Sequence, residues 1–110
     1  MSQQEIDINL LKELCKDEDN IIITQHTLTR CIQRNITVDE ILQTIENGEI
    51  IEQYPEDYPN PSCLVFGITL NNKILHVVCG TDGSTLWIIT AYIPNSIKWE
   101  SDFKTRRKEN

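Results

Sequence analysis

Three segments in the first half of the chain carry apolar residues at the spacing of an amphipathic helix. Residues 5–16 place apolar side chains three or four positions apart, which predicts a first helix. Residues 24–34 repeat the pattern with Leu28, Cys31 and Ile32 on one stripe, which predicts a second. The β-branched run at residues 21–23 lies between them. It fits either a brief extended segment or the approach to the second helix.

A third helix is predicted from Thr37 to Gly48. Thr37 and Glu40 have the spacing of a capping box, in which each side chain bonds the other residue's backbone N–H. Gly48 follows the last apolar position, where a left-handed residue commonly ends a helix. This helix has the clearest boundaries of the three.

After Gly48 the apolar period changes to two, which is typical of strands. Strands are predicted at residues 49–54, 62–70, 73–80 and 85–93. We therefore expect an α+β fold of two to three N-terminal helices packed on a four-stranded antiparallel sheet. A chain of 110 residues has the size of one domain, so residues 1–110 are assigned to a single domain.

The turn residues predict a register for the sheet. A two-residue turn at Asn71-Asn72 sets Leu70 opposite Lys73, and therefore Gly67 opposite His76. The helices would then meet the side of the sheet formed by Leu64, Phe66, Ile68, Leu75 and Val77. A second turn, at Asp82-Gly83, would pair Cys79 with Thr85. It would bring three residues of the last strand to the side of His76: Ile88, Thr90 and Tyr92.

Charge is unevenly distributed along the chain. The net charge is −7, which argues against nonspecific nucleic-acid binding, and we expect no DNA partner. Residues 39–57 hold seven acidic residues and no basic one, whereas residues 98–108 hold five basic residues and two acidic ones. The basic run forms either a local anion site or, at residues 104–108, a solvated tail.

Targeting signals and metal-binding spacing are not visible in the sequence. Residues 1–11 lack the basic and apolar regions of a signal peptide, and no apolar run has the length of a membrane span. We therefore expect a cytoplasmic protein without a membrane partner. The four cysteines form no C-x-x-C pair, so we expect free structural thiols, no metal and no cofactor.

Two histidines and several arginines are the candidates for chemistry. His26, Arg30 and Arg34 recur every four residues and share one face of the second helix, where they are either a phosphate-binding ridge or a solvated face. His76 lies within an apolar strand and is either a site residue or a hydrogen-bonded core histidine. Metal-free RNA cleavage needs a base, an acid and a cation, and these residue types supply all three.

Several motifs resemble a known family. They are His26-x-x-x-Arg30-x-x-x-Arg34, Tyr54-x-x-Asp57-x-Pro59-x-Pro61-Ser62, His76-Val77-Val78, Ile89-Thr90-x-Tyr92-x-Pro94, Trp99, Phe103 and Lys104-Thr105-Arg106. Together they resemble the domain-of-unknown-function 4258 family of small bacterial proteins, over residues 21–107. The predicted helix at residues 5–16 would be an addition. The family is similar in layout to the RelE, ParE and BrnT toxins.

The resemblance implies a toxin of a toxin–antitoxin pair, acting as a metal-independent endoribonuclease on RNA and neutralised by a zinc-ribbon antitoxin. Carried onto this chain, it implies the catalytic residues His26, Arg30, His76 and Tyr92. It implies as substrate-binding residues Arg34, Thr90 and Arg106.

Two alternatives stay open. A non-enzymatic interaction or regulatory module is suggested by the acidic stretch and by Trp87 and Trp99, because tryptophans often anchor partners. A small-molecule pocket above Gly67 is the other.

Overall fold

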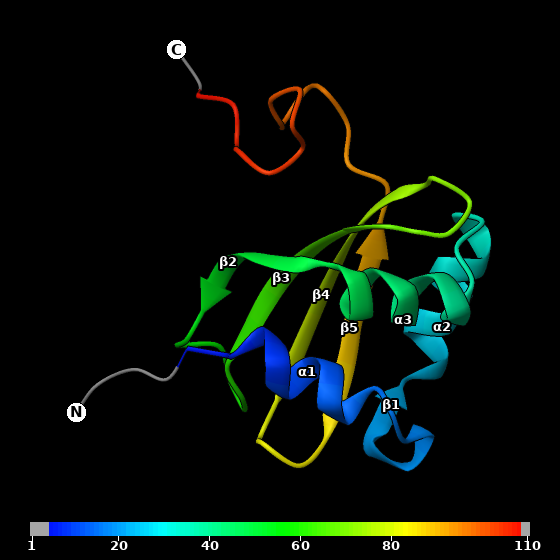
Figure 1. The fold of residues 1–110 in the computed structure, drawn as a ribbon, viewed down its shortest axis with the longest axis vertical. Coiled ribbons are helices and arrows are strands. Elements are labelled where there is room, and N and C mark those ends of the chain that lie inside the picture. Colours follow the sequence, from blue (N-terminus) through cyan, green and yellow to red (C-terminus); the bar gives the residue numbers. More distant parts are fainter. Residues whose placement is uncertain (1–4, 109–110) are drawn as a thin grey trace.

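The computed structural model of the chain describes residues 5–108 (Figure 1). The helices are α1 (Ile8–Leu14), the 3-10 turn η1 (Glu18–Asn20), α2 (Gln25–Gln33) and α3 (Val38–Asn47). The strands are β1 (Ile21–Ile23), β2 (Glu49–Tyr54), β3 (Ser62–Ile68), β4 (Ile74–Thr81) and β5 (Leu86–Tyr92). The α+β class and the predicted strands after Gly48 are confirmed. The helix predicted at residues 5–16 is shorter, because it begins after the Asp7 cap and ends at Leu14.

The sheet has five strands among the described residues, in the order β1-β5-β4-β3-β2. The prediction of four antiparallel strands is wrong in this respect, because residues 21–23 form an edge strand parallel to β5. Three residues are too few to show a period of their own. Only their pairing with β5 makes them a strand.

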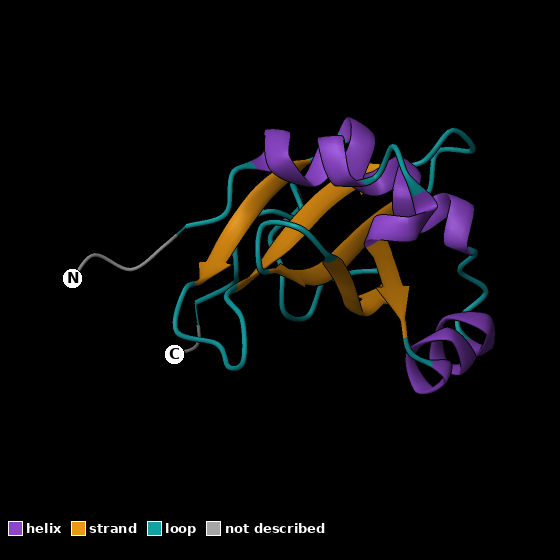
Figure 2. Cartoon of the chain, turned by 90° about the horizontal axis from the view of Figure 1, so that it is seen from below, coloured by secondary structure: helices purple, strands orange, loops and turns teal. Residues whose placement is uncertain are grey.

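The two faces of the sheet are covered differently. Figure 2 shows α1 and α3 against one face, with the loops that follow β5 on the other. The helix-side core combines residues of α1 and α3 with alternate residues of the strands, among them Leu11, Ile45, Val65 and Val77. None of the helices in residues 5–108 is long and apolar enough to span a membrane.

The predicted register between β3 and β4 is wrong by one residue, because the loop that joins these two strands has three residues and not two. Thr69 N–H donates to the carbonyl of Lys73 at 2.9 Å, so residues 70–72 form the loop. Asn72 takes a positive φ of 66°, as expected for the last residue of a three-residue hairpin loop. Phe66, and not Gly67, is therefore opposite His76.

A shift of one residue exchanges the faces of a strand. The helix side is formed by Val65, Gly67, Leu75 and Val77, so the predicted apolar face of Leu64, Phe66 and Ile68 is the opposite one. Gly67 lies under α3: a Cβ there would be 2.5 Å from the carbonyl oxygen of Thr44. The alternative of a small-molecule pocket above Gly67 is thus excluded, since α3 occupies that space.

The second hairpin also differs from its prediction. Cys79 pairs with Ile88 rather than Thr85, and an irregularity after Val78 places Tyr92 directly opposite His76. Ile88 was predicted on the same face of the sheet as His76, but it is buried in the helix-side core on the opposite face. The extra residue of β5 at this irregularity thus decides which side chains accompany His76.

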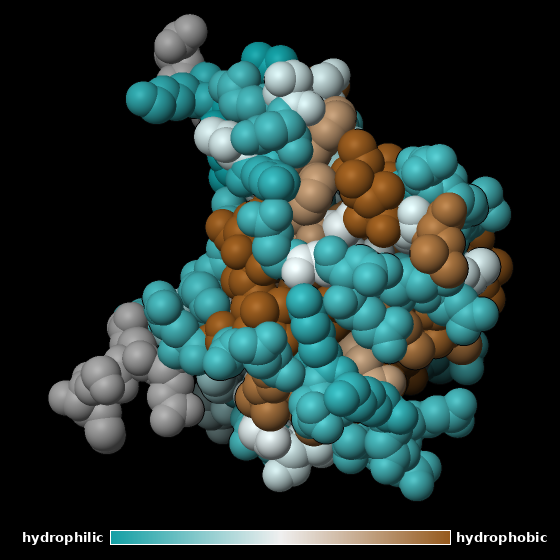
Figure 3. Space-filling view, viewed as in Figure 1, coloured by the Kyte–Doolittle hydropathy of each residue, from teal (hydrophilic) through white to brown (hydrophobic). Residues whose placement is uncertain are grey.

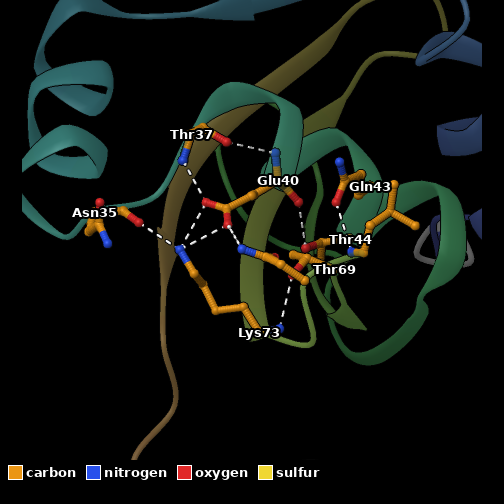
Figure 4. Close-up of polar contacts among 9 residues, drawn as sticks. Asn35, Thr37, Glu40, Gln43, Thr44, Thr69 and Lys73 are labelled. Atoms are coloured by element: carbon orange, nitrogen blue, oxygen red, sulfur yellow. Dashed lines mark hydrogen bonds and ion pairs between the residues drawn. The ribbon is translucent and has the colours of Figure 1, made fainter.

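The buried carboxylate of Glu40 connects α3 to the loop between β3 and β4 (Figure 4). Glu40 accepts hydrogen bonds from the backbone N–H of Thr37 and from the side chains of Asn71 and Lys73. The Thr37–Glu40 capping box is confirmed. These contacts hold the three-residue loop in place against the start of α3.

Gly48 ends α3 as predicted, but for another reason. Its φ of −105° and ψ of −170° are extended and not left-handed. A Cβ at Gly48 would lie 2.2 Å from the carbonyl oxygen of Thr44 and 2.3 Å from that of Phe66. Glycine is needed there because two backbone segments approach closely.

Candidate functional site

His76 is fully buried in β4, and both ring nitrogens are hydrogen-bonded. Nε2 lies 2.6 Å from the carbonyl oxygen of Phe103, and Nδ1 lies 3.2 Å from the hydroxyl of Tyr92. A carbonyl can only accept, so Nε2 carries the proton. Burial favours the neutral ring, and in that form Nδ1 accepts a hydrogen bond from the Tyr92 hydroxyl, with its lone pair toward Tyr92.

Aromatic rings enclose the imidazole. The centroids of Trp99, Tyr92 and Phe66 lie 4.5, 5.2 and 6.2 Å from that of His76, all in edge-to-face arrangements. This burial lowers the pKa of His76 below its usual value, although the bond to the Phe103 carbonyl and the charge of Glu52 act in the opposite direction. The imidazole of His76 is therefore neutral at neutral pH.

The segment after β5 folds back over this face of the sheet. Trp99 and Arg106 form an antiparallel bridge, and the guanidinium of Arg106 lies 4.7 Å from the ring centroid of Trp99. Phe103, at the turn, takes a positive φ of 56°. In Figure 3 the segment projects from the body as a largely hydrophilic arm.

Two ion pairs fasten this arm to β2. Arg106 binds Glu52 through two nitrogens, at 2.7 and 3.1 Å, and Lys104 lies 2.9 Å from Glu49. The basic run at residues 104–108 is therefore not simply a solvated tail. Its charges meet the acidic stretch that the sequence carries in β2.

Glu52 connects Arg106 to a tyrosine. Burial alone would raise the pKa of Glu52, but hydrogen bonds from Arg106 and Tyr54 outweigh it and hold the pKa below the ordinary value. Burial and the neighbouring Glu52 carboxylate raise the pKa of Tyr54 to about 12. Glu52 is thus ionised and Tyr54 protonated at neutral pH.

A pocket of about 640 Å³ opens beside this cluster. It is lined by Arg34, Tyr92, Ile93, Asn95, Lys98, Trp99 and Arg106. Three of these side chains are cations and none is an acid. The guanidinium of Arg34 is held in place because it donates to the hydroxyl of Thr90 at 3.2 Å and to the carbonyl of Ala91 at 2.8 Å.

The structure brings together five of the seven predicted site residues. Arg34, Tyr92 and Arg106 line the pocket, Thr90 positions Arg34, and His76 lies behind Tyr92.

The other two predicted residues lie elsewhere. His26 and Arg30 are exposed on α2 and do not belong to the lining. Their catalytic role stays a prediction, as do the roles assigned to the other five.

Three contributors were missed by sequence reasoning: Asn95 and Lys98 in the lining, and Glu52 as the partner of Arg106. Lys98 begins the basic run at residues 98–108, which was the one available signal. Nothing in the local sequence of Glu52 indicates an arginine partner 54 positions away.

The residue types of the pocket suit an anion rather than a metal. Within residues 5–108 no group of three or more histidine, cysteine or acidic side chains could hold a metal ion. Arginine offers forked donors that match phosphate oxygens, and a lysine adds a compact positive charge. The arrangement can therefore bind a phosphate-sized group, with the Tyr92 hydroxyl available for proton transfer.

Comparison with known proteins gives one match. A family model described as Domain of unknown function (DUF4258) matches residues 23–93. No curated protein and no solved structure matches the chain significantly. The expected likeness to the RelE, ParE and BrnT toxins stays a prediction.

Proposed function

Because the chain belongs to the DUF4258 family, whose description assigns no activity, we propose a function from the pocket itself: metal-independent cleavage of RNA. The observation that carries the proposal is the convergence of Arg34, Lys98 and Arg106 on one pocket with Tyr92. Arg34 is far in sequence from the other two cations, which lie in the segment after β5. In a chain of net charge −7, they give one local site for an anionic backbone.

In the proposed reaction the 2′ oxygen of RNA attacks the adjacent phosphorus, and the bond from phosphorus to the 5′ oxygen breaks. Tyr92 accepts the 2′-hydroxyl proton while its own proton moves to Nδ1 of His76. The leaving 5′ oxygen takes a proton from water, and His76 returns its proton through Tyr92. Arg34 and Arg106 stabilise the charge that develops on the phosphate oxygens. The products are a 2′,3′-cyclic phosphate and a 5′-hydroxyl end.

The relay depends on the tautomer of His76 that its hydrogen-bond partners imply. A neutral imidazole whose Nδ1 faces the Tyr92 hydroxyl can accept its proton. The Phe103 carbonyl holds the opposite nitrogen at 2.6 Å and keeps the ring in that orientation. Burial disfavours the charged ring, which favours rapid return of the proton.

The test uses labelled single-stranded RNA and the matching DNA, incubated with the purified protein in a chelator. We expect cut RNA with cyclic-phosphate ends and intact DNA, since DNA lacks the 2′-hydroxyl. Tyr92→Phe should abolish cleavage and retain RNA binding, whereas Arg34→Gln should weaken binding. Lys16→Gln removes an exposed charge from the turn that follows α1 and is the matched control. RNA that is neither cut nor bound would refute the proposal.

His26→Gln and Arg30→Gln test the two predicted residues outside the lining. If either abolishes cleavage while RNA binding persists, the catalytic set extends along α2 beyond the pocket. Unchanged cleavage assigns the chemistry to the pocket alone.

The second candidate is a binding module without catalysis. It is favoured by the complete burial of His76 and by exposed apolar side chains: Ile93, in the pocket lining, is exposed by 52%, and Ile97, next to Lys98 in the sequence, by 82%. Such a surface also suits the proposed antitoxin partner, which would cover the cations with acidic groups. RNA bound but left intact by the wild-type chain would favour this candidate. Growth arrest on expression, relieved by Tyr92→Phe, would favour the toxin.

A further inference from the structure

A second pocket, of about 470 Å³, lies between the start of α2, the strand β5 and the β2–β3 loop. Its lining residues are Ile22, Thr24, Thr27, Asp57, Tyr58, Pro59, Asn60, Gly80, Trp87, Ile88 and Ile89. It shares no lining residue with the basic pocket. Its size falls within the range of small-molecule sites.

The walls of this second pocket are apolar and aromatic. Tyr58 is 95% exposed, and Ile22 and Ile89 are 44% and 46% exposed, so the rest of the described chain leaves Tyr58 almost uncovered and the two isoleucines nearly half uncovered. Trp87 lies opposite Gly80 in the sheet. Glycine leaves this part of the wall open, because a Cβ there would lie 3.6 Å from the Cδ1 atom of Ile89 and fill the space between them.

Asp57 is the one charged residue in the lining. Its carboxylate accepts a hydrogen bond from the hydroxyl of Ser62, which is fully buried, and its backbone N–H donates to the carbonyl of Tyr54. The carboxylate is therefore held in place at the pocket. Both threonine hydroxyls of the lining are hydrogen-bonded, since Thr27 donates to the carbonyl of Ile89 and Thr24 donates to Thr27.

We propose that this pocket binds a small organic cation, with an apolar ring against Trp87 and Tyr58 and an ammonium group beside Asp57. The apolar ring packs on the aromatic side chains, and the carboxylate adds a direct charge pair with the ammonium group. A neutral molecule of the same shape loses the charge pair, and an anion is repelled. The occupant is a free small molecule, because the pocket is compact and its single carboxylate matches a single positive charge.

The experiment compares benzylamine, benzyl alcohol and benzoate as probes, with binding followed by NMR at the indole N–H of Trp87 and the amide of Gly80. We expect benzylamine to bind about tenfold more tightly than benzyl alcohol, and benzoate to bind least. Asp57→Asn should make the first two equal. Asp39→Asn, which removes an exposed carboxylate of α3, should change nothing.

Equal binding of the three probes, or no shift at Trp87 and Gly80, would overturn the proposal. If a trilysine peptide bound the pocket more tightly than benzylamine and displaced it, the occupant would be a segment of a protein and not a free small molecule. Trp87→Leu, checked for an unchanged fold by its amide spectrum, should lose benzylamine binding. The outcome is independent of RNA cleavage, because the two pockets share no residue.

Discussion

The hydroxyl of Tyr92 lies 3.2 Å from Nδ1 of His76, and the two residues are direct partners across β5 and β4. This contact joins the interior of the sheet to the basic pocket, since His76 is fully buried and Tyr92 lines the pocket. A hydroxyl at the pocket is thus oriented by a ring that solvent does not reach.

Replacing His76 should make the fold less sensitive to mild acid. Burial lowers the pKa of His76 in the folded state, so the unfolded chain binds more protons below pH 6.5. The free energy of unfolding should therefore fall as the pH drops through the unfolded value of 6.5. His76→Leu should lose this dependence and also cost roughly 2–4 kcal/mol, because it leaves the Phe103 carbonyl and the Tyr92 hydroxyl without partners.

Urea unfolding at about pH 7.5 and about pH 5.5 measures the acid dependence. His26→Gln removes the exposed histidine and is the matched control. If His76→Leu retained the acid dependence of the wild type between these two values, the assignment to His76 would be wrong.

Glu52→Gln should lower the pKa of Tyr54. Burial is the larger cause of the value of about 12, and the Glu52 carboxylate adds to it, so the pKa should move toward 10.0 without reaching it. An ultraviolet titration of tyrosinate measures the change, and Tyr54→Phe identifies which transition belongs to Tyr54. The free energy of unfolding should fall by only about 0.5–1 kcal/mol, because Arg106 is half exposed and solvent screens its ion pair with Glu52. An unchanged titration would contradict the contact.

Glu40→Gln should destabilise the fold by roughly 2–4 kcal/mol, since it breaks a nearly buried ion pair with Lys73. The hydrogen bond from Lys73 is the main cause that lowers the pKa of Glu40. Its stabilisation is therefore present above the unfolded value of 4.5 and is lost as the pH falls through the lower folded value. Urea unfolding tests this, with Asp39→Asn as the exposed control. Equal losses in both variants would refute the role of Glu40.

Gly67→Ala should cost roughly 2–3 kcal/mol, because a Cβ would lie 2.5 Å from the Thr44 carbonyl and α3 would have to move. Gly83→Ala is the comparison. Its φ of +98° strains any side chain, but nothing lies within 4 Å, so the cost should be about 1 kcal/mol. Thermal unfolding ranks the two variants. If Gly67→Ala lowered the stability less than Gly83→Ala does, the close contact with α3 would not be what requires glycine at position 67.

The sequence by itself determined the helices α2 and α3, the four longer strands and the α+β class. These features depend on periodicity and on short-range chemistry, such as the bond between Thr37 and Glu40 three residues away. It also indicated the acidic and basic segments that meet as Glu49–Lys104 and Glu52–Arg106, though not which residues would pair.

The tertiary structure alone decided the register, the fifth strand and the site. One additional residue in the hairpin loop reversed the predicted faces of β3, whereas Leu75 and Val77 of β4 face the helices as predicted. The preference between two-residue and three-residue loops is too small to be settled by Asn71-Asn72. The pocket required Arg34, at the end of α2, to meet Lys98 and Arg106 of the segment after β5 around Tyr92. Such convergence depends on how the chain packs as a whole, because no local pattern encodes the distance between Arg34 and Arg106.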